Sequence, residues 1–324
     1  MSDVCALFDG DSLAHRAYHA MPRLWTHRGA PNHAVYGFAA MLLKALGALR
    51  PACAAIAWDT PVPTFRHVAF AGYKAQRSAP PPDLYPQVDR IRDLADALGL
   101  ACLAQEGYEA DDLLASLAVQ AAADGFEVVI VTGDTDALQL VGPGVRVLTP
   151  VKGLSEAVLY DEAAVRARCG VGPDQVADLK ALAGDPSDNI PGVPGVGART
   201  AARLLAEFGD LETLLASPDR LPPRHRDALL AHADALRRNR ALTTMRFDAP
   251  VRFDPSASQL DGRDRPAVAA RLRSLGLGRL ADRLPDPTAP PPPARRRRRS
   301  TAPDTAQLPL FGPAAAGPTR DRNG

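Results

Sequence analysis

The feature that most restricts the fold is the alternation of short apolar runs with longer amphipathic stretches over the first 150 residues. The apolar runs have the length of buried strands, and those predicted are Val4–Phe8, Cys53–Trp58, Val128–Val131 and Val145–Leu148. The stretches between them repeat apolar residues with a helical period, and the predicted helices are His33–Leu49, Leu84–Leu98 and Asp111–Ala123. Strands that alternate with helices predict an α/β fold, with a mostly parallel central sheet flanked by helices.

The character of the chain changes twice after this region. From Asp161 to Leu284 the pattern is almost wholly helical, with short breaks that contain Gly and Pro. After Leu284 the composition narrows to Pro, Ala, Arg, Thr and Gly, which is typical of a disordered tail. We therefore predict an α/β core over residues 1–160, a helical region over 161–284 and a disordered Pro/Arg-rich tail over 285–324.

Acidic residues stand where the predicted strands end. Asp9 and Asp59 close the first two strands, and Asp134 and Asp136 follow Val128–Val131. Because the carboxyl ends of parallel strands lie along one edge of a sheet, these side chains are expected to converge. Two further acidic segments, 109–112 and 185–188, complete the candidate metal ligands: Asp9, Asp59, Glu109, Asp111, Asp112, Asp134, Asp136, Asp185 and Asp188.

So many carboxylates in one cleft repel one another unless cations neutralise them. Oxygen ligands favour two or more Mg²⁺ or Mn²⁺ ions, and the lack of nearby His and Cys argues against zinc. The alternative for any single Asp is a helix cap or a turn residue, which explains Asp111 or Asp161 alone. Five clusters, three of them at strand ends, favour the metal site.

A glycine-rich turn precedes the segment 198–208. Free N–H groups at the start of a helix bind phosphates, and glycines let DNA approach the backbone. This pattern predicts a helix-hairpin-helix type contact with duplex DNA through Gly192, Gly195, Gly197, Arg199, Thr200 and Arg203. A nucleotide-binding P-loop is excluded, because Ala198-Arg199 stands where Lys-Ser/Thr is required. Six Arg between residues 217 and 240 either extend the DNA track or form a solvated helix face.

The formal net charge of +1 conceals two opposite parts. Residues 285–324 hold seven Arg and three Asp, a net charge of +4, which leaves −3 for residues 1–284. The four cysteines, Cys5, Cys53, Cys102 and Cys169, form no C-x-x-C pair and are predicted to be buried free thiols. With no apolar run of membrane-spanning length and no basic leader, the expected location is cytoplasmic.

The motifs together resemble the flap endonuclease superfamily, particularly the 5′-nuclease domain at the front of bacterial DNA polymerase I. The resemblance covers about residues 3–284. Its segments are Phe8-Asp-Gly-Asp-Ser-Leu-Ala-His-Arg16, Ala34-Val-Tyr-Gly-Phe38, Phe65-Arg-His67, Gly72-Tyr-Lys-Ala-Gln-Arg77, Gly107-Tyr-Glu-Ala-Asp-Asp112, Thr132-Gly-Asp-Thr-Asp136 and Gly184-Asp-Pro-Ser-Asp-Asn-Ile-Pro-Gly-Val193.

The resemblance implies functions for these positions. All nine carboxylates match the metal ligands of the family, and a helical arch is implied around residues 70–90. Tyr73, Lys74 and Arg77 match positions that meet the scissile phosphate and the threaded 5′ strand, and Arg16 matches a motif position near the first ligand. His15 and Asp11 depart from the residues common at those positions, but neither removes a ligand.

The implied activity is two-metal hydrolysis of DNA phosphodiesters at 5′ ends, 5′ flaps, nicks and gaps, RNA-primed ends included. Because no polymerase segment follows, we expect a stand-alone, monomeric, nucleoid-associated nuclease without membrane contact. The alternatives are a non-cleaving DNA-junction binder that recruits the sliding clamp, and a PIN-like ribonuclease.

A short apolar motif stands in the tail beyond five consecutive arginines, Arg295 to Arg299. Gln307, Leu308, Leu310 and Phe311 are similar to the peptide with which bacterial replication proteins bind the sliding clamp. A segment of this kind does not fold alone but fills a groove on a partner. The tail therefore predicts clamp binding through residues 307–311.

Overall fold

The computed structural model of the chain describes residues 3–152, 156–256, 265–282 and 284. The chain divides into two compact units, Met1–Thr288 and Ala289–Gly324, and the account below concerns the first. The predicted disordered tail and the clamp residues Gln307, Leu308, Leu310 and Phe311 lie outside the described residues.

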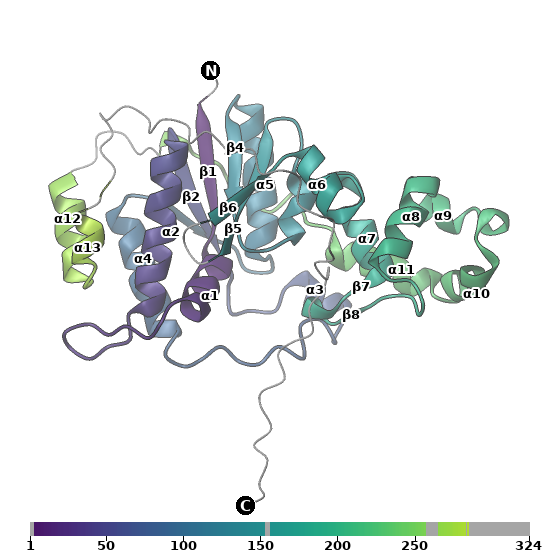
Figure 1. The fold of residues 1–324 in the computed structure, drawn as a ribbon, viewed down its shortest axis with the longest axis horizontal. Coiled ribbons are helices and arrows are strands. Elements are labelled where there is room, and N and C mark those ends of the chain that lie inside the picture. Colours follow the sequence, from purple (N-terminus) through teal and green to yellow (C-terminus); the bar gives the residue numbers. More distant parts are fainter. Residues whose placement is uncertain (1–2, 153–155, 257–264, 283, 285–324) are drawn as a thin grey trace, which may run out of the picture. The chain divides into compact units, whose positions relative to one another are not determined.

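A six-stranded sheet forms the centre of the unit, in the order β3-β2-β1-β4-β5-β6 (Figure 1). Its strands are β1 Val4–Asp9, β2 Cys53–Trp58, β3 Ala101–Ala104, β4 Glu127–Val131, β5 Val145–Lys152 and β6 Glu156–Tyr160. The first five strands run parallel and β6 is antiparallel to β5, which confirms the predicted, mostly parallel sheet. The chain moves from β1 through β2 to β3, then crosses back to place β4 on the other side of β1. This reversal marks the edge where ligands bind in such sheets.

Alternate residues of β1 enter two separate cores. Ala6 and Phe8 face the core on one side of the sheet, while Cys5 and Leu7 face the other. The first core is covered by α1 Gly10–Ala20, α2 His33–Leu49, α4 Tyr85–Ala97, α12 Arg265–Ser274 and α13 Gly278–Ala281. The second is covered by α5 Ala110–Ala123 and by the helical region that follows the sheet. Burial on both faces explains why the central strands are continuous apolar runs.

The region after the sheet is largely helical, as predicted. Its helices are α6 Glu162–Cys169, α7 Val176–Ala183, α8 Ala198–Phe208, α9 Leu211–Leu215, α10 Pro223–Ala231 and α11 Ala233–Thr243. Two short strands, β7 Gly184–Asp185 and β8 Ile190–Pro191, interrupt this series. No helix among the described residues is long and apolar enough to cross a membrane.

One long segment departs from the predicted helical pattern. Residues 244–255 contain no helix and run along α5. Their backbone replaces intrahelical hydrogen bonds with side-chain partners: Ala249 N donates to Ser116 Oγ (3.0 Å), and Phe253 N donates to Gln120 Oε1 (2.8 Å). The sequence pattern did not indicate this because the partners belong to a distant helix.

The predicted helical arch around residues 70–90 is helical only from Tyr85 onward. After the short helix α3 Phe65–Ala69, residues 71–76 form turns and residues 77–81 are irregular, and helix resumes only at Tyr85. Pro80, Pro81 and Pro82 account for the break. Proline removes hydrogen-bond donors and disfavours helical geometry in the preceding residue.

The four cysteines are free, as predicted, but they are not all buried. Cys5 and Cys53 are buried, whereas Cys102 is exposed. Cys102 lies on the edge strand β3, along which exposed and half-buried residues alternate.

Candidate active site and metal centre

The first group of carboxylates gathers where β1, β2 and β4 end. Asp9 is the last residue of β1, Asp59 follows β2 directly, and Asp134 lies three residues beyond β4. The Thr132 hydroxyl donates to Asp9 Oδ2 (2.6 Å), and the backbone N–H of Ala110 donates to Asp59 Oδ1 (2.7 Å). These contacts bring the start of α5, with Asp111 in its first turn, to the same edge of the sheet.

Asp9 is the most enclosed member of this group, at 4% exposure. Burial raises its pKa to about 7. Hydrogen bonds from Thr132 and Ser12 oppose that rise, while repulsion from Asp134 and Asp59 adds to it. Burial also raises the pKa of Asp59. Without a cation, the carboxylates at this edge resist simultaneous ionisation.

The environment of the Asp111 carboxylate indicates whether these residues can bind a cation. Its Oδ1 is buried and has no hydrogen-bond partner among the described residues. Burial raises the pKa of Asp111 well above the ordinary value, and repulsion from Asp134, Asp9 and Glu109 contributes. A buried oxygen without a donor is costly, and a hard divalent cation is the partner that such oxygens favour. The residues present therefore fit an oxygen-ligated metal ion.

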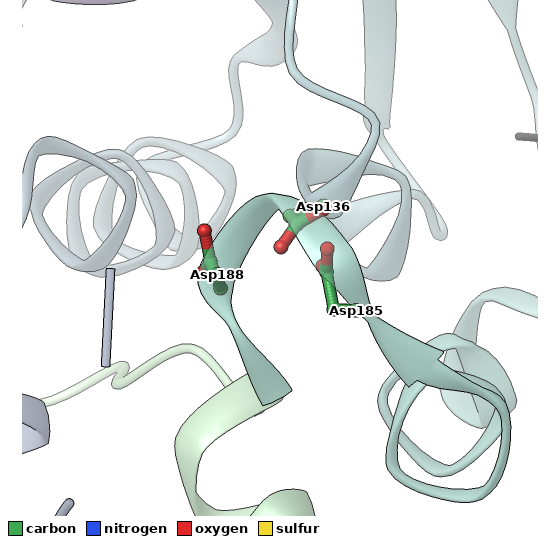
Figure 2. Close-up of side chains that lie close together, drawn as sticks. All are labelled: Asp136, Asp185 and Asp188. Atoms are coloured by element: carbon green, nitrogen blue, oxygen red, sulfur yellow. The ribbon is translucent and has the colours of Figure 1, made fainter. Parts of the chain in front are cut away.

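A second group consists of Asp136, Asp185 and Asp188 (Figure 2). Each offers a carboxylate oxygen, and the three oxygens lie within 4.8 Å of one another. Asp136 begins the 3₁₀ turn η1 Asp136–Leu140, while Asp185 ends β7 and Asp188 ends the turn η3 Pro186–Asp188. Residues about fifty positions apart in sequence thus converge only through the fold.

Lys180 lies in this second group, although the sequence analysis did not assign it a function. Its ammonium group donates to Asp136 and, at 2.7 Å, to Asp185 Oδ2. Burial would raise the pKa of Asp185, but Lys180 and the hydrogen bonds from Ser187 outweigh burial and lower it. The sequence contained one indication of this function: Lys180 is one of only four Lys among the 38 Lys and Arg residues of the chain.

Tyr73 joins the two groups. Its hydroxyl lies 3.0 Å from both Glu109 Oε2 and Asp188 Oδ2. Lys74 Nζ donates to Glu109 Oε1 (2.9 Å), and Arg77 donates to Asp188 Oδ1 (2.7 Å). Burial opposes the charge on Lys74, but Glu109 and Asp188 outweigh it and raise the lysine pKa. The structure thus brings the predicted phosphate-contacting residues Tyr73, Lys74 and Arg77 to the carboxylates.

Asp112 has contacts unlike those of the other eight carboxylates. It is fully buried, and its two oxygens accept four hydrogen bonds. The donors are the Arg66 guanidinium, with two bonds, and the backbone N–H groups of Glu109 and Arg246. Asp112 was predicted to bind metal, and in this structure both lone pairs of each of its oxygens accept hydrogen bonds.

Arg16 lies beside the first group without contacting a carboxylate. Its Nη2 donates to the carbonyl of Val151 (2.7 Å), and its side chain passes about 3.7 Å from the Cβ position of Gly133. The buried Nε of Arg16 has no hydrogen-bond partner within the described part of the chain. The structure therefore places Arg16 against the loop that carries Asp134.

The predicted glycine turn contains glycines of two kinds. Gly195 has a φ of +80° and Gly197 is the N-cap of α8, and both are exposed with open space at the Cβ position. At Gly192, by contrast, a Cβ would lie 2.3 Å from the backbone carbon of Ala183. Arg199 and Arg203 on α8 are exposed, and Thr200 is half-buried. The close approach of β7 and β8 therefore accounts for Gly192, while Gly195 and Gly197 leave a backbone surface open.

A mostly parallel sheet that gathers carboxylates at its carboxyl edge, followed by a helical region with an exposed glycine turn, fits the class of metal-dependent nucleases. The chain belongs to the 5′–3′ exonuclease family. Residues 4–170 match the N-terminal resolvase-like domain of this family, and residues 171–266 match its C-terminal SAM fold. The resemblance inferred from the sequence motifs is confirmed.

Curated relatives of the chain include bacterial DNA polymerases I. The thermostable enzyme of Thermus aquaticus is 45% identical over 274 residues, which are 85% of this chain and 32% of that protein. The enzyme of Chloroflexus aurantiacus is 43% identical over 317 residues, 95% of this chain and 32% of that protein. The chain spans about a third of the length of these relatives.

Solved structures share the fold at low identity. The bacteriophage T5 flap endonuclease, in a pseudo-enzyme-product complex with DNA and metal ions, has a TM-score of 0.61 and 19% identity. That likeness covers 86% of this chain and 99% of the phage chain. The catalytic core of Rad2 with DNA substrate has a TM-score of 0.57 and 16% identity, over 88% of this chain and 92% of the Rad2 chain. These likenesses confirm the predicted fold class.

Proposed function

We propose that this 5′–3′ exonuclease family member hydrolyses DNA phosphodiesters at 5′ ends, 5′ flaps, nicks and gaps with two or more Mg²⁺ or Mn²⁺ ions. The observation that carries the proposal is the buried Oδ1 of Asp111, which has no donor within the described part of the chain and lies beside the carboxylates that end β1, β2 and β4. We assign the ions to two groups. The first is Asp9, Asp59, Glu109, Asp111 and Asp134, and the second is Asp136, Asp185 and Asp188.

The ions, when bound, supply a nucleophilic water and stabilise the leaving oxygen. The remaining contacts with the phosphate come from side chains of the protein. Tyr73, Lys74 and Arg77 are held at Glu109 and Asp188, so a phosphate that reaches either group also meets an ammonium and a guanidinium. These cations offset negative charge that develops on the phosphate. We propose that Arg16 steadies the loop that presents Asp134.

The helical region supplies a grip on duplex DNA in this proposal. The exposed N-terminus of α8, with Gly195 and Gly197 before it, presents backbone N–H groups for a phosphate. Arg199, Thr200 and Arg203 add side-chain contacts on the same end of the helix. We thus assign catalysis to the core of residues 1–160 together with Asp185 and Asp188, and the DNA grip to the exposed start of α8 in the helical region.

Two further assignments rest on the sequence. We propose that residues 307–311 bind the sliding clamp and that the protein acts as a cytoplasmic, nucleoid-associated monomer. Deletion of residues 307–311 should abolish clamp binding in a pull-down with purified clamp, while cleavage of free DNA is unchanged. Equal clamp affinity of the deletion variant contradicts the clamp assignment.

One assay tests the main proposal. Purified protein is incubated with 5′-labelled flap DNA, nicked duplex, blunt duplex and single-stranded RNA, with Mg²⁺, with Mn²⁺ and with EDTA. We expect metal-dependent cleavage of the flap and nicked DNA, abolished by Asp134→Asn. DNA binding without cleavage supports a junction binder instead, and cleavage of RNA alone supports a PIN-like ribonuclease.

A further inference from the structure

Asp111 and Asp112 are neighbours in sequence but have opposite environments. Asp111 has a buried oxygen that receives no hydrogen bond from the residues the structure describes, whereas each Asp112 oxygen accepts two. Oδ2 accepts from Arg66 Nη1 (2.7 Å) and Glu109 N (3.1 Å), and Oδ1 accepts from Arg66 Nη2 (2.8 Å) and Arg246 N (2.8 Å). An oxygen with both lone pairs engaged has none left for a cation.

The partner guanidinium is enclosed as well, with Arg66 only 3% exposed. Besides its two bonds to Asp112, Arg66 donates from Nε to the carbonyl of Leu242 (2.8 Å) and from Nη2 to the carbonyl of Thr244 (3.2 Å). Burial would lower the pKa of Arg66, but the pairing with Asp112 outweighs burial and raises it. The pair is therefore a permanent ion pair with several directed bonds, and Arg66 Nη1 also lies 3.5 Å from Glu109 Oε2.

These bonds join three segments that are far apart in sequence. Arg66 lies on α3, which leads into the residues that contact the phosphate, Asp112 lies in the first turn of α5 next to Glu109, and Leu242 to Arg246 end the helical region. Because bidentate geometry is rigid, the pair holds these segments at one spacing.

The end of α11 and the residues just after it also form hydrogen bonds with the segments that carry the second carboxylate group. Gln139, in the turn η1 that begins with Asp136, donates to the carbonyl of Thr243 (3.1 Å) and accepts from Met245 N (2.9 Å). Asn239 Nδ2 on α11 donates to the carbonyl of Pro191 (2.7 Å), next to the turn that holds Asp188. A series of hydrogen bonds thus connects Glu109, through Asp112 and Arg66, to the two segments that carry the second group.

We propose that Asp112 is not a metal ligand but forms, with Arg66, a positioning pair that fixes the helical region and α3 against the start of α5. The pair sets the distance between the two metal-binding groups and the place of the DNA grip relative to them. This inference rests on the proposed function.

The test compares Asp112→Asn with Asp134→Asn, which remove the same charge a short distance apart. Mn²⁺ binding is measured by titration calorimetry, and kcat and KM are measured on a 5′-flap DNA well below the melting temperature. We expect Asp134→Asn to weaken Mn²⁺ binding by more than the roughly 10- to 100-fold loss that follows removal of a group acting through a ligand. Asp112→Asn should change it by less than about tenfold, the lower end of the loss expected for a group that acts through a ligand. Asp112→Asn should instead raise KM for the flap several-fold and lower the Tm.

A paired variant keeps the test valid if the single variant does not fold. Arg66→Met leaves the buried charge of Asp112 unpaired, whereas Arg66→Met with Asp112→Ala removes both charges without adding side-chain volume. We expect the double variant to be more thermostable than Arg66→Met, to bind Mn²⁺ within about tenfold of wild type and to keep a raised KM.

The outcomes separate this inference from the proposed function. Loss of Mn²⁺ binding in Asp112→Asn and in the double variant, equal to that in Asp134→Asn, makes Asp112 a ligand and overturns the positioning pair. Unchanged KM in a folded double variant overturns it as well. Full Mn²⁺ binding and cleavage by Asp134→Asn overturns the metal centre itself.

Discussion

The Thr132 hydroxyl donates a 2.6 Å hydrogen bond to Asp9 Oδ2, which joins the end of β4 to the end of β1. The same hydroxyl oxygen accepts from the backbone N–H of Asp134 (2.9 Å). Thr132 is fully buried, so this side chain sets the positions of two carboxylates at once.

Thr132→Val should therefore reduce cleavage by about 10- to 100-fold at neutral pH, because the two carboxylates lose a shared partner. The bond from Thr132 opposes the rise in the pKa of Asp9, so its loss should shift the acid limb of the pH–rate profile upward. Thr132→Ser keeps the hydroxyl and serves as the control. A profile and rate for Thr132→Val equal to those of wild type contradict this role.

The metal-free protein should lose stability as the pH rises. Asp9 has a pKa of about 7 in the fold against an ordinary value of 3.8, so the folded state binds this proton more tightly. Its contribution is fully present below the unfolded value and is lost as pH rises through about 7. In EDTA, the Tm of wild type minus that of Asp9→Asn should therefore fall from pH 4 to pH 8, because the amide cannot ionise. Saturating Mn²⁺ should restore the wild-type Tm at pH 8, and a pH-independent difference argues against the shifted carboxyl.

Lys180 should compete with the metal at the second group. Its ammonium occupies oxygens of Asp136 and Asp185, so Lys180→Met should tighten Mn²⁺ binding there by about tenfold and lower the Tm in EDTA. Lys44→Met, on the exposed side of α2, is the matched control. Titration calorimetry measures the Mn²⁺ affinity of both variants. If only Lys180→Met binds Mn²⁺ more weakly than wild type, Lys180 stabilises the metal site and does not compete with the ion.

The two kinds of glycine in the turn before α8 should separate stability from DNA binding. Gly192→Ala places a methyl group 2.3 Å from the Ala183 backbone and should lower the Tm by several degrees. Gly197→Ala meets open space, although Ala is a poorer N-cap residue than Gly, so it should lower the Tm much less while it weakens binding to nicked duplex DNA. Thermal melts and fluorescence anisotropy measure the two effects, and an equal loss of Tm in both variants rules out the distinction.

Arg199→Ala and Arg203→Ala should each weaken DNA binding without sequence preference. If each arginine contacts one phosphate, each substitution should reduce the slope of log affinity against log salt by about one. Arg146→Ala is a suitable control, since Arg146 pairs with Glu127 on the surface and lies outside the helical region. An unchanged salt slope in both variants excludes phosphate contacts at the start of α8.

Much of the site was predictable because it depends on local patterns. The strands β1, β2 and β4 are continuous apolar runs, and the acidic residues stand where those runs end, so a parallel sheet was enough to bring Asp9, Asp59 and Asp134 together. Residues 70–84 of the predicted arch are not helical, although the three consecutive prolines that interrupt the helix are visible in the sequence itself. The strand β3 was not predicted because its residues are only half-buried at an edge.

Sequence alone determined which acidic residues the chain brings to the edge of the sheet, because the spacing of apolar residues along the chain predicts where strands end and helices begin. Only the tertiary structure decided what each carboxylate does there. Asp111 and Asp112 share one helical turn, yet one keeps a bare oxygen and the other is saturated by Arg66 and Arg246. The difference arises because hydrogen-bond donors from residues 66 and 246 reach only one face of that turn, and no pattern local to residues 109–112 records which face it is.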